Sequence, residues 1–184
     1  MNTSHIVEYK NIRLRPLEKD DLEILRKIRN DSFVSMYLTK ISFISSEMQR
    51  EWYKKVLKEP TEIIFTIEER EKLKRCVGSC SLYKIADKDA LFGKIATDPE
   101  ARGMKVGTNS IIAALHVGFS ILGLEHIDLF VHKQNHVAKK VYSSIGFEAI
   151  GEEDLEQERM SITSERFYHK YDFQNDVIIN SVNQ

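Results

Sequence analysis

The sequence contains little of what marks three common classes of protein. Cysteine occurs only twice among 184 residues, at Cys76 and Cys80, which excludes a secreted disulfide framework and offers too few ligands for a zinc site. No apolar run approaches the length of a membrane span, and residues 1–30 lack the pattern of a signal peptide. Basic and acidic residues nearly cancel, 27 against 28, which excludes a broad electrostatic field for nucleic acid. We therefore expect a cytoplasmic protein with no nucleic-acid partner, no membrane partner and no bound metal.

Breaks in the chain are also few. There are three prolines and eight glycines, and no repeat or low-complexity tract interrupts the sequence. Apolar residues make up 42% and charged residues 30%, which are ordinary proportions for a globular protein. The length suits one buried domain and is short for two. We predict one domain over residues 1–175, followed by a polar tail over residues 176–184.

The spacing of apolar residues changes along the chain. A spacing of three and four residues marks the segments that we expect to be helical, and β-branched and aromatic residues gather in the expected strands. The expected helices are residues 19–30, 44–59, 106–122 and 136–145. The expected strands are residues 11–17, 62–69, 76–85, 91–97, 126–132, 147–153 and 166–173. This order predicts an α/β fold in which one mixed sheet carries helices on its faces.

Three local features lead to specific expectations. Pro16 ends the first expected strand, which favours an edge position in the sheet. Met48 and Trp52 lie on one stripe of the second expected helix and should face the core. Cys76 and Cys80 lie four residues apart in one strand, so we expect both reduced side chains on the same face.

A basic run that contains glycine follows the expected strand 91–97. The run DPEARGMKVGTNSIIAALHVGF, residues 98–119, carries Arg102, Gly103, Lys105 and Gly107 just before an apolar helix. A turn of this kind at a helix N-terminus presents successive backbone N–H groups to an anion. The run lacks the GK[ST] ending of a Walker loop and the three spaced glycines of a dinucleotide fingerprint. It therefore predicts an anion site of another kind.

Two motifs resemble the GNAT acyltransferase superfamily. Arg102 and Gly107 fit the R/Q-x-x-G-x-G/A segment that binds diphosphate in that family, with Lys105 in place of the middle glycine. The later run LFVHKQNHVAKKVYSSIGF, residues 129–147, fits the family's pattern N-x-x-A-x-x-x-Y-x-x-x-GF. Its matching residues are Asn135, Ala138, Tyr142, Gly146 and Phe147. The resemblance is nearly continuous from residue 91 to residue 147.

The resemblance implies a single-domain fold with a mixed, largely antiparallel sheet. Two central parallel strands, residues 91–97 and 126–132, would splay apart around acetyl-CoA, with helices on both faces of the sheet. The pantetheine arm would pair as an extra strand with the backbone of Ile95, Ala96 and Thr97. The diphosphate would lie on the amides of Arg102, Gly103, Met104, Lys105, Val106, Gly107 and Thr108.

The second motif implies further roles. Asn135 and Ala138 would line the pantetheine arm, and Lys140 belongs to a basic cluster that would help to hold the cofactor phosphates. Tyr142 resembles the general acid that protonates the departing CoA thiolate. The base that deprotonates the amine is less well marked, and Asp98 and His132 are the two candidates. Asp98 also suits a structural role in the turn before Pro99.

The acceptor that we expect is a small-molecule amine. Arg29, Asn30, Tyr37, Glu47 and Trp52 resemble a pattern in N-acetyltransferases of nucleotide-linked amino sugars, where Arg would meet phosphate and aromatic rings would stack. The alternatives are a polyamine, for which residues 151–158 (GEEDLEQE) could supply carboxylates, and a protein N-terminal amine. A non-catalytic acyl-CoA-binding module is the alternative of another class, and a homodimer is possible through the terminal strands.

Overall fold

The strands of the chain form one mixed sheet. The computed structural model describes residues 5–35, 43–152, 154–173 and 177–181, and nine strands lie within these ranges in the order β7-β8-β6-β5-β4-β3-β2-β1-β9. Only β5 and β6 run parallel in this part of the chain, so the expected largely antiparallel sheet is confirmed. The strands are β1 (His5–Tyr9), β2 (Ile12–Pro16), β3 (Ile63–Glu69), β4 (Arg75–Ala86), β5 (Asp89–Thr97), β6 (His126–His132), β7 (Glu148–Glu152), β8 (Gln157–Thr163) and β9 (Val177–Ser181).

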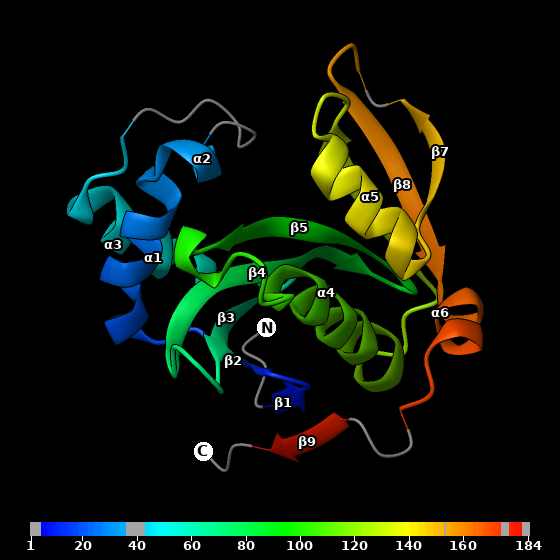
Figure 1. The fold of residues 1–184 in the computed structure, drawn as a ribbon, viewed down its shortest axis with the longest axis horizontal. Coiled ribbons are helices and arrows are strands. Elements are labelled where there is room, and N and C mark those ends of the chain that lie inside the picture. Colours follow the sequence, from blue (N-terminus) through cyan, green and yellow to red (C-terminus); the bar gives the residue numbers. More distant parts are fainter. Residues whose placement is uncertain (1–4, 36–42, 153, 174–176, 182–184) are drawn as a thin grey trace.

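Helices cover both faces of the sheet, as expected. On one face, α1 (Leu22–Asn30) and α3 (Ser46–Val56) pack over Ile64 and Ala96. On the other face, α4 (Val106–His116) and α5 (His136–Ile145) share the larger core with Phe65, Phe92 and Ile127 (Figure 1). The short α2 (Ser32–Ser35) follows α1, and α6 (Ser164–Lys170) follows β8. No helix among the described residues combines the length and the apolar character needed to cross a membrane.

The hydrophobic spacing accounts for the helices that lie near the site. In α1, Leu22, Leu25 and Ile28 recur every three residues, and all three are buried. The expected helix 106–122 is present, although its last turn, Val117–Ile121, is π-helical. In α5, Gly146 follows the last residue with φ of 127°, which ends the helix as expected.

The C-terminal part of the chain differs from the prediction in two places. Residues 166–173 were expected to form a strand, but residues 164–170 form α6, and the strand is β8 just before them. The Thr163 hydroxyl accepts a hydrogen bond from the Arg166 amide and caps this helix, and Phe167 is fully buried. The alternation of aromatic residues in this segment therefore gave a false strand pattern. Val177–Ser181 pair as β9 with β1, within the segment predicted to be a polar tail.

Pro16 does not mark an edge strand, because β2 lies between β1 and β3. Pro16 is the last residue of β2, where the missing N–H interrupts the ladder least. In α3 the exposed fraction of Met48 is 48%, and Gln49 is the buried residue instead, so the predicted stripe begins one position too early. Trp52 is half-buried and packs against the smaller core cluster, which includes Leu25 and Ile28 of α1.

Cys76 and Cys80 lie on opposite faces of β4, which corrects the expectation that they share one. The β3–β4 register shifts between Ile67 and Glu68, which places one extra residue of β4 between the two cysteines. Such a bulge reverses the faces of all residues beyond it. Cys80 is therefore in the core beneath α4, whereas Cys76 packs beside α1, and both thiols are free.

Candidate active site

The central feature of the site is the separation of β5 from β6. The two strands pair only at Asp89–His126, Ala90–Ile127 and Leu91–Asp128. Beyond these pairs β5 continues to Thr97 along β4, and β6 continues along β8, so the strands diverge. In Figure 1, β8, the partner of β6, runs away from β5. No described strand pairs with the β6-facing edge of β5 after Leu91. The predicted residues Ile95, Ala96 and Thr97 lie along this edge, where an extended ligand arm can add as a strand.

A bulge in β5 lies at the start of the opening. The β4–β5 register shifts between Ser79 and Ser81, and Lys94 has a positive φ of 52°. The Lys94 ammonium contacts both carboxylate oxygens of Glu62, at 2.6 and 2.7 Å, and lies 4.8 Å from the centre of the Tyr83 ring. The contact of Lys94 with Glu62 and Tyr83 was not predicted from the sequence. Its one local signal is a lysine directly after Gly93 in an otherwise apolar strand.

The loop between β5 and α4 adopts the conformation that its glycines predict. Gly103 has φ of 76°, and Lys105 has φ of 57° and ψ of 16°, which is also left-handed. Lys105 therefore adopts the backbone conformation that the middle glycine of the motif favours. A left-handed conformation costs a residue with a side chain about 1–2 kcal/mol, so the surrounding structure must hold it there.

The first turn of α4 offers unused N–H groups to a ligand. The amides of Val106, Gly107 and Thr108 have no carbonyl of the helix to bond, and Lys105, at the N-cap position, makes no side-chain capping bond. A Cβ atom built on Gly107 would meet no atom within 4 Å, so the space beside this turn is open. This arrangement fits an anion such as a diphosphate, because the amides and the helix dipole both favour negative charge.

The second motif lies on α5, across the opening from the loop. The Asn135 carboxamide oxygen accepts the Ala138 amide at 3.1 Å and caps α5. Ala138 packs against the core, so its small side chain lies at the buried side of the helix. Lys139 is ion-paired with Glu158, and Lys140 is exposed.

Tyr142 lies in the same helix and is buried. Its ring packs edge-on against Phe147, with centroids 5.8 Å apart. Burial raises the pKa of the Tyr142 phenol to about 12, with smaller contributions from the nearby Cys80 and Tyr83. The phenol therefore keeps its proton at neutral pH, which a proton donor requires.

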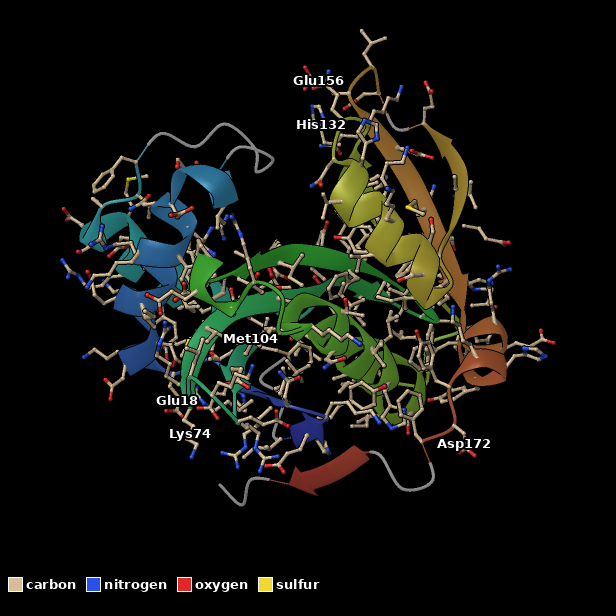
Figure 2. All side chains as sticks on the ribbon, in the orientation of Figure 1. Glu18, Lys74, Met104, His132, Glu156 and Asp172 are labelled. Atoms are coloured by element: carbon tan, nitrogen blue, oxygen red, sulfur yellow. The ribbon has the colours of Figure 1, made fainter. Side chains whose placement is uncertain are left out.

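The two candidate bases lie on either side of the opening. Asp98 directly follows β5, and both of its carboxylate oxygens are engaged, one by the Glu100 amide at 2.9 Å and one by Arg75 at 2.8 Å. His132 ends β6, and its Nδ1 atom accepts the Gln134 amide at 3.2 Å (Figure 2). The two contacts of Asp98 fit a structural role in the turn after β5. That Asp98 or His132 acts as the base stays a prediction.

The predicted acceptor residues have different surroundings. Arg29 is the notable one: its Nε atom is buried, and no described group accepts a hydrogen bond from it. Burial lowers the pKa of its guanidinium. The Asn30 side chain is occupied, because it donates to the Ile44 carbonyl at 2.9 Å and accepts the Ile44 amide at 2.8 Å. Glu47 is exposed in the first turn of α3, and Tyr37 lies outside the described residues.

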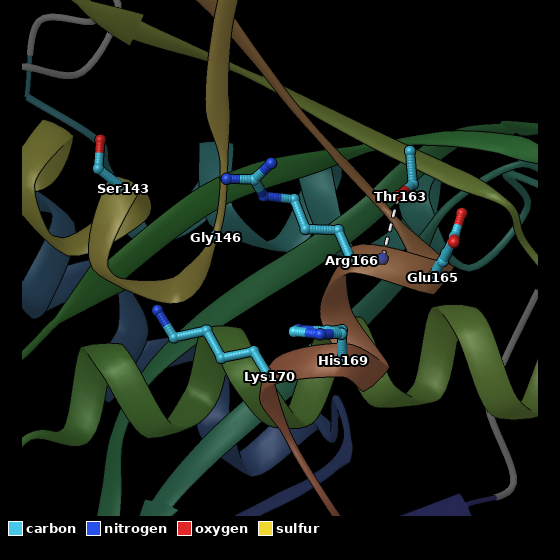
Figure 3. A pocket seen from close by; sticks show the side chains of 7 residues that line it. All are labelled: Ser143, Gly146, Thr163, Glu165, Arg166, His169 and Lys170. Atoms are coloured by element: carbon cyan, nitrogen blue, oxygen red, sulfur yellow. Dashed lines mark hydrogen bonds between the residues drawn. The ribbon is translucent and has the colours of Figure 1, made fainter.

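A separate cavity of about 710 Å³ lies between α5 and α6 (Figure 3). Its lining includes Thr163, which pairs with His126 at the closed end of the β5–β6 opening. The arginine and the lysine in its lining both have partners. Arg166 contacts Glu148 at 2.6 Å, and Lys170 donates to the Ser144 carbonyl at 2.5 Å. This cavity therefore lies away from the opening and presents no unpaired positive charge from these two side chains.

Comparisons with known proteins agree with this geometry. The family model described as "Acetyltransferase (GNAT) domain" matches residues 11–148. The spermidine N(1)-acetyltransferase of Escherichia coli K12 is 29% identical over 145 residues, which are 77% of this chain and 75% of that protein. The spermidine N-acetyltransferase of Vibrio cholerae, solved with CoA and spermine, aligns with a TM-score of 0.77 and 27% identity over 85% of this chain and 98% of that chain.

A nucleotide-linked sugar GNAT is also similar in fold. Apo FdhC aligns with a TM-score of 0.76 over 92% of this chain and 94% of its own, at 22% identity. The family match covers both motifs, from the loop before α4 to Phe147 in the turn after α5. The divergent strands and the uncapped first turn of α4 fit the cofactor of that family. The chain belongs to the GNAT acetyltransferase family and is an N-acetyltransferase that takes its acetyl group from acetyl-CoA.

Proposed function

We propose that this enzyme acetylates the amino group of a nucleotide-linked amino sugar. The observation that carries the choice of acceptor is Arg29, a half-buried residue whose buried Nε atom has no hydrogen-bond partner among the described residues. A buried charge is costly unless an opposite charge meets it. A diphosphate on the acceptor supplies that charge and matches the planar donor face of arginine.

In this proposal the cofactor binds along the free edge of β5 and on the loop before α4. Backbone groups of Ile95, Ala96 and Thr97 hold the pantetheine arm. Of the expected diphosphate amides, residues 102–108, those of Val106, Gly107 and Thr108 are the main donors. The Arg102 and Met104 amides already donate to the Pro99 and Ala101 carbonyls, each at 3.2 Å. Asn135 and Ala138 line the arm from α5, and Lys140 adds positive charge near the phosphates. The support for this placement is the unpaired edge, the uncapped helix and the open space beside Gly107.

The reaction is a direct transfer. The neutral amine attacks the thioester carbonyl, a C–N bond forms, and the C–S bond breaks as electrons return to the carbonyl. Tyr142 donates its phenolic proton to the departing sulfur and regains a proton from solvent. The proton lost by the amine passes to a base at the mouth of the opening, for which Asp98 and His132 are the candidates.

The sequence around the acceptor side carries few acidic residues. The connection between α1 and α3, residues 31–45, contains one aspartate, Asp31, and no glutamate, and Glu47 follows in the first turn of α3. A polyamine carries several positive charges and would need carboxylates near Arg29 rather than another cation. Trp52 of α3 packs against the core cluster that contains Leu25 and Ile28 of α1, and Asn30 bonds α1 to Ile44 just before α3.

A polyamine is the second candidate, because the relatives that act on spermidine are 27–29% identical to this chain. The carboxylates that could bind it lie in residues 151–158. Two of them already have basic partners, since Glu152 contacts Lys133 at 2.8 Å and Glu158 contacts Lys139. The hairpin tip, where Glu156 lies, is on the other side of the opening from α1 (Figures 1 and 2). These pairs reduce the negative charge that a polyamine would meet.

The test is release of free CoA thiol with acetyl-CoA and a panel of amines. The panel contains uridine- and thymidine-diphosphate-linked amino sugars, spermidine, and a peptide with a free N-terminus. Turnover that is highest with a nucleotide-linked amino sugar, and a KM for it that rises about a hundredfold in Arg29→Met, would support the proposal. Highest turnover with spermidine would reject the sugar. Tight CoA binding without turnover of any amine would indicate a binding module, and self-association into a homodimer is measured separately by light scattering.

A further inference from the structure

We infer that Asn11 is a positioning residue for acetyl-CoA, because its side chain holds the loop before α4 in the conformation that presents the amides. Asn11 lies in the turn between β1 and β2, far in sequence from the loop. The diphosphate is assigned to this loop by the proposed function, so the inference rests on that proposal and deepens it. Neither family motif includes Asn11.

The Asn11 carboxamide contacts the loop on both sides of Lys105. Its Nδ2 atom donates to the Met104 carbonyl at 3.0 Å. Its Oδ1 atom accepts a hydrogen bond from Nδ2 of Asn109 at 2.7 Å. Met104 lies by the N-terminal end of α4 (Figure 2), and Asn109 lies in the next turn, where its amide bonds the Lys105 carbonyl at 2.9 Å. One side chain therefore fixes the peptide before Lys105 and the helical turn after it.

Asn11 is itself held rigidly by the β3–β4 hairpin. Its carbonyl accepts the Arg70 amide at 2.9 Å, and its Nδ2 atom also approaches the Glu69 carboxylate at 3.4 Å. Glu69 is 1% exposed and accepts the amides of Glu71, Lys72 and Leu73 at 3.1, 2.8 and 2.6 Å. Burial by itself raises the pKa of Glu69, but these amides lower it below the ordinary value, so the carboxylate stays charged and ordered. The chain of contacts runs from the hairpin through Asn11 to the loop.

The loop needs such support because two of three successive residues have left-handed backbones. Gly103 adopts this conformation without strain, whereas Lys105 does not. Strained backbone persists only where neighbouring structure determines it. Without the bond to Met104, the loop can relax around Lys105, and the amides of residues 106–108 no longer converge before the ligand arrives. The free energy of binding acetyl-CoA is then reduced by the cost of ordering these amides.

The experiment compares two acetyl donors in wild type and in Asn11→Ala. Acetyl-CoA carries the diphosphate, and S-acetyl-pantetheine lacks it, so only the first depends on the loop. We expect kcat/KM for acetyl-CoA to fall about tenfold through KM, with kcat at saturation unchanged. We expect kcat/KM for S-acetyl-pantetheine to stay within about twofold, which general damage to the fold would not allow. Equal losses with both donors, or no loss with either, would overturn the inference.

Three further variants complete the test. Asn109→Ala removes one contact and keeps the bond to Met104, so it should show the same donor-specific loss to a smaller degree, and it gives the answer if Asn11→Ala does not fold. Thr163→Ala removes a helix cap at the far end of β8 and should leave both donors unaffected. Gly107→Val tests the loop itself. If Gly107→Val leaves CoA affinity unchanged, the proposed diphosphate site fails; if it weakens CoA and Asn11→Ala does not, only the role of Asn11 fails.

Discussion

The ring of Tyr142 lies edge-on to the ring of Phe147, with centroids 5.8 Å apart and planes at 67°. This contact holds the phenol by its ring, independently of the hydroxyl. Removing the hydroxyl should therefore leave the packing of α5 against the turn after it unchanged. The hydroxyl and the ring can be tested separately.

Tyr142→Phe should lower kcat by about a hundredfold or more, because the proton donor to the sulfur is lost. The dissociation constant for CoA should change by less than about twofold, since the interaction is needed in the transition state. Steady-state kinetics and calorimetry measure the two quantities. Tyr168→Phe is the control, because Tyr168 is an exposed tyrosine on α6, away from the opening. An unchanged kcat in Tyr142→Phe would mean that another group protonates the thiolate.

The buried phenol should also leave a signature in stability at high pH. The pKa of Tyr142 is raised from 10.0 to about 12, so folding favours the protonated form. This contribution is fully present below pH 10 and is lost as the pH rises toward 12, where the unfolded chain ionises first. We expect wild type to lose on the order of 2 kcal/mol more than Tyr142→Phe over this range. Urea unfolding of both proteins at several pH values measures the difference, and parallel pH curves would contradict the buried position of the phenol.

Arg29→Met should make the free protein more stable while it impairs the enzyme. Methionine replaces a half-buried guanidinium, whose Nε atom has no partner among the described residues, with an apolar side chain of similar length, and such changes stabilise by about 1 kcal/mol or more. Thermal unfolding without ligands measures the gain, and the KM for the acceptor measures the loss. Arg26→Met is the control, because Arg26 is paired with Glu23 and bonds the Ile44 carbonyl, so its loss should not stabilise. A destabilised Arg29→Met would show that Arg29 contributes to the fold.

Lys105→Gly should stabilise the protein, because glycine adopts the left-handed backbone without strain. The gain should be about 0.5–1 kcal/mol, since greater freedom of the unfolded chain offsets part of the relief. Lys74→Gly is the matched control, because Lys74 has φ of 51° in the β3–β4 turn, outside the proposed site. Both variants should gain stability by urea unfolding, and only Lys105→Gly can alter CoA affinity through the lost ammonium. A loss of stability in Lys105→Gly would contradict the strained conformation.

The parts of the site that could be predicted from the sequence are those fixed by short-range geometry. Asn135 and Gly146 begin and end one helix, and their spacing determines where Tyr142 lies on it. The run from Gly103 to Gly107 predicts its own turn, because left-handed backbone and helix start are local properties. The strands β3 to β6 were found for the same reason, since their segments gather β-branched and aromatic residues between polar turns.

The parts that were not predicted depend on contacts between distant segments or on a single inserted residue in a strand. Asn11 meets Met104 across 93 positions, and Lys94 meets Glu62 across 32, so no local pattern shows either contact. The faces of Cys76 and Cys80 depended on one bulge in β4, which periodicity cannot indicate. Residues 164–170 became a helix because burial of Phe167 and a threonine cap outweighed a strand-like alternation of aromatic residues.

The divergence of β5 and β6 has a mechanical consequence. Only three residue pairs join the half of the sheet that carries the loop before α4 to the half that carries α5 and Tyr142. The backbone groups along the facing edge of β5 stay without a partner among the described strands until a ligand binds there. A ligand arm that bonds to this edge would take the place of the missing strand. In the proposed mechanism, donor binding and alignment of Tyr142 with the scissile bond are then one event. We expect the protein to be less rigid across this seam in the free state than in the donor complex.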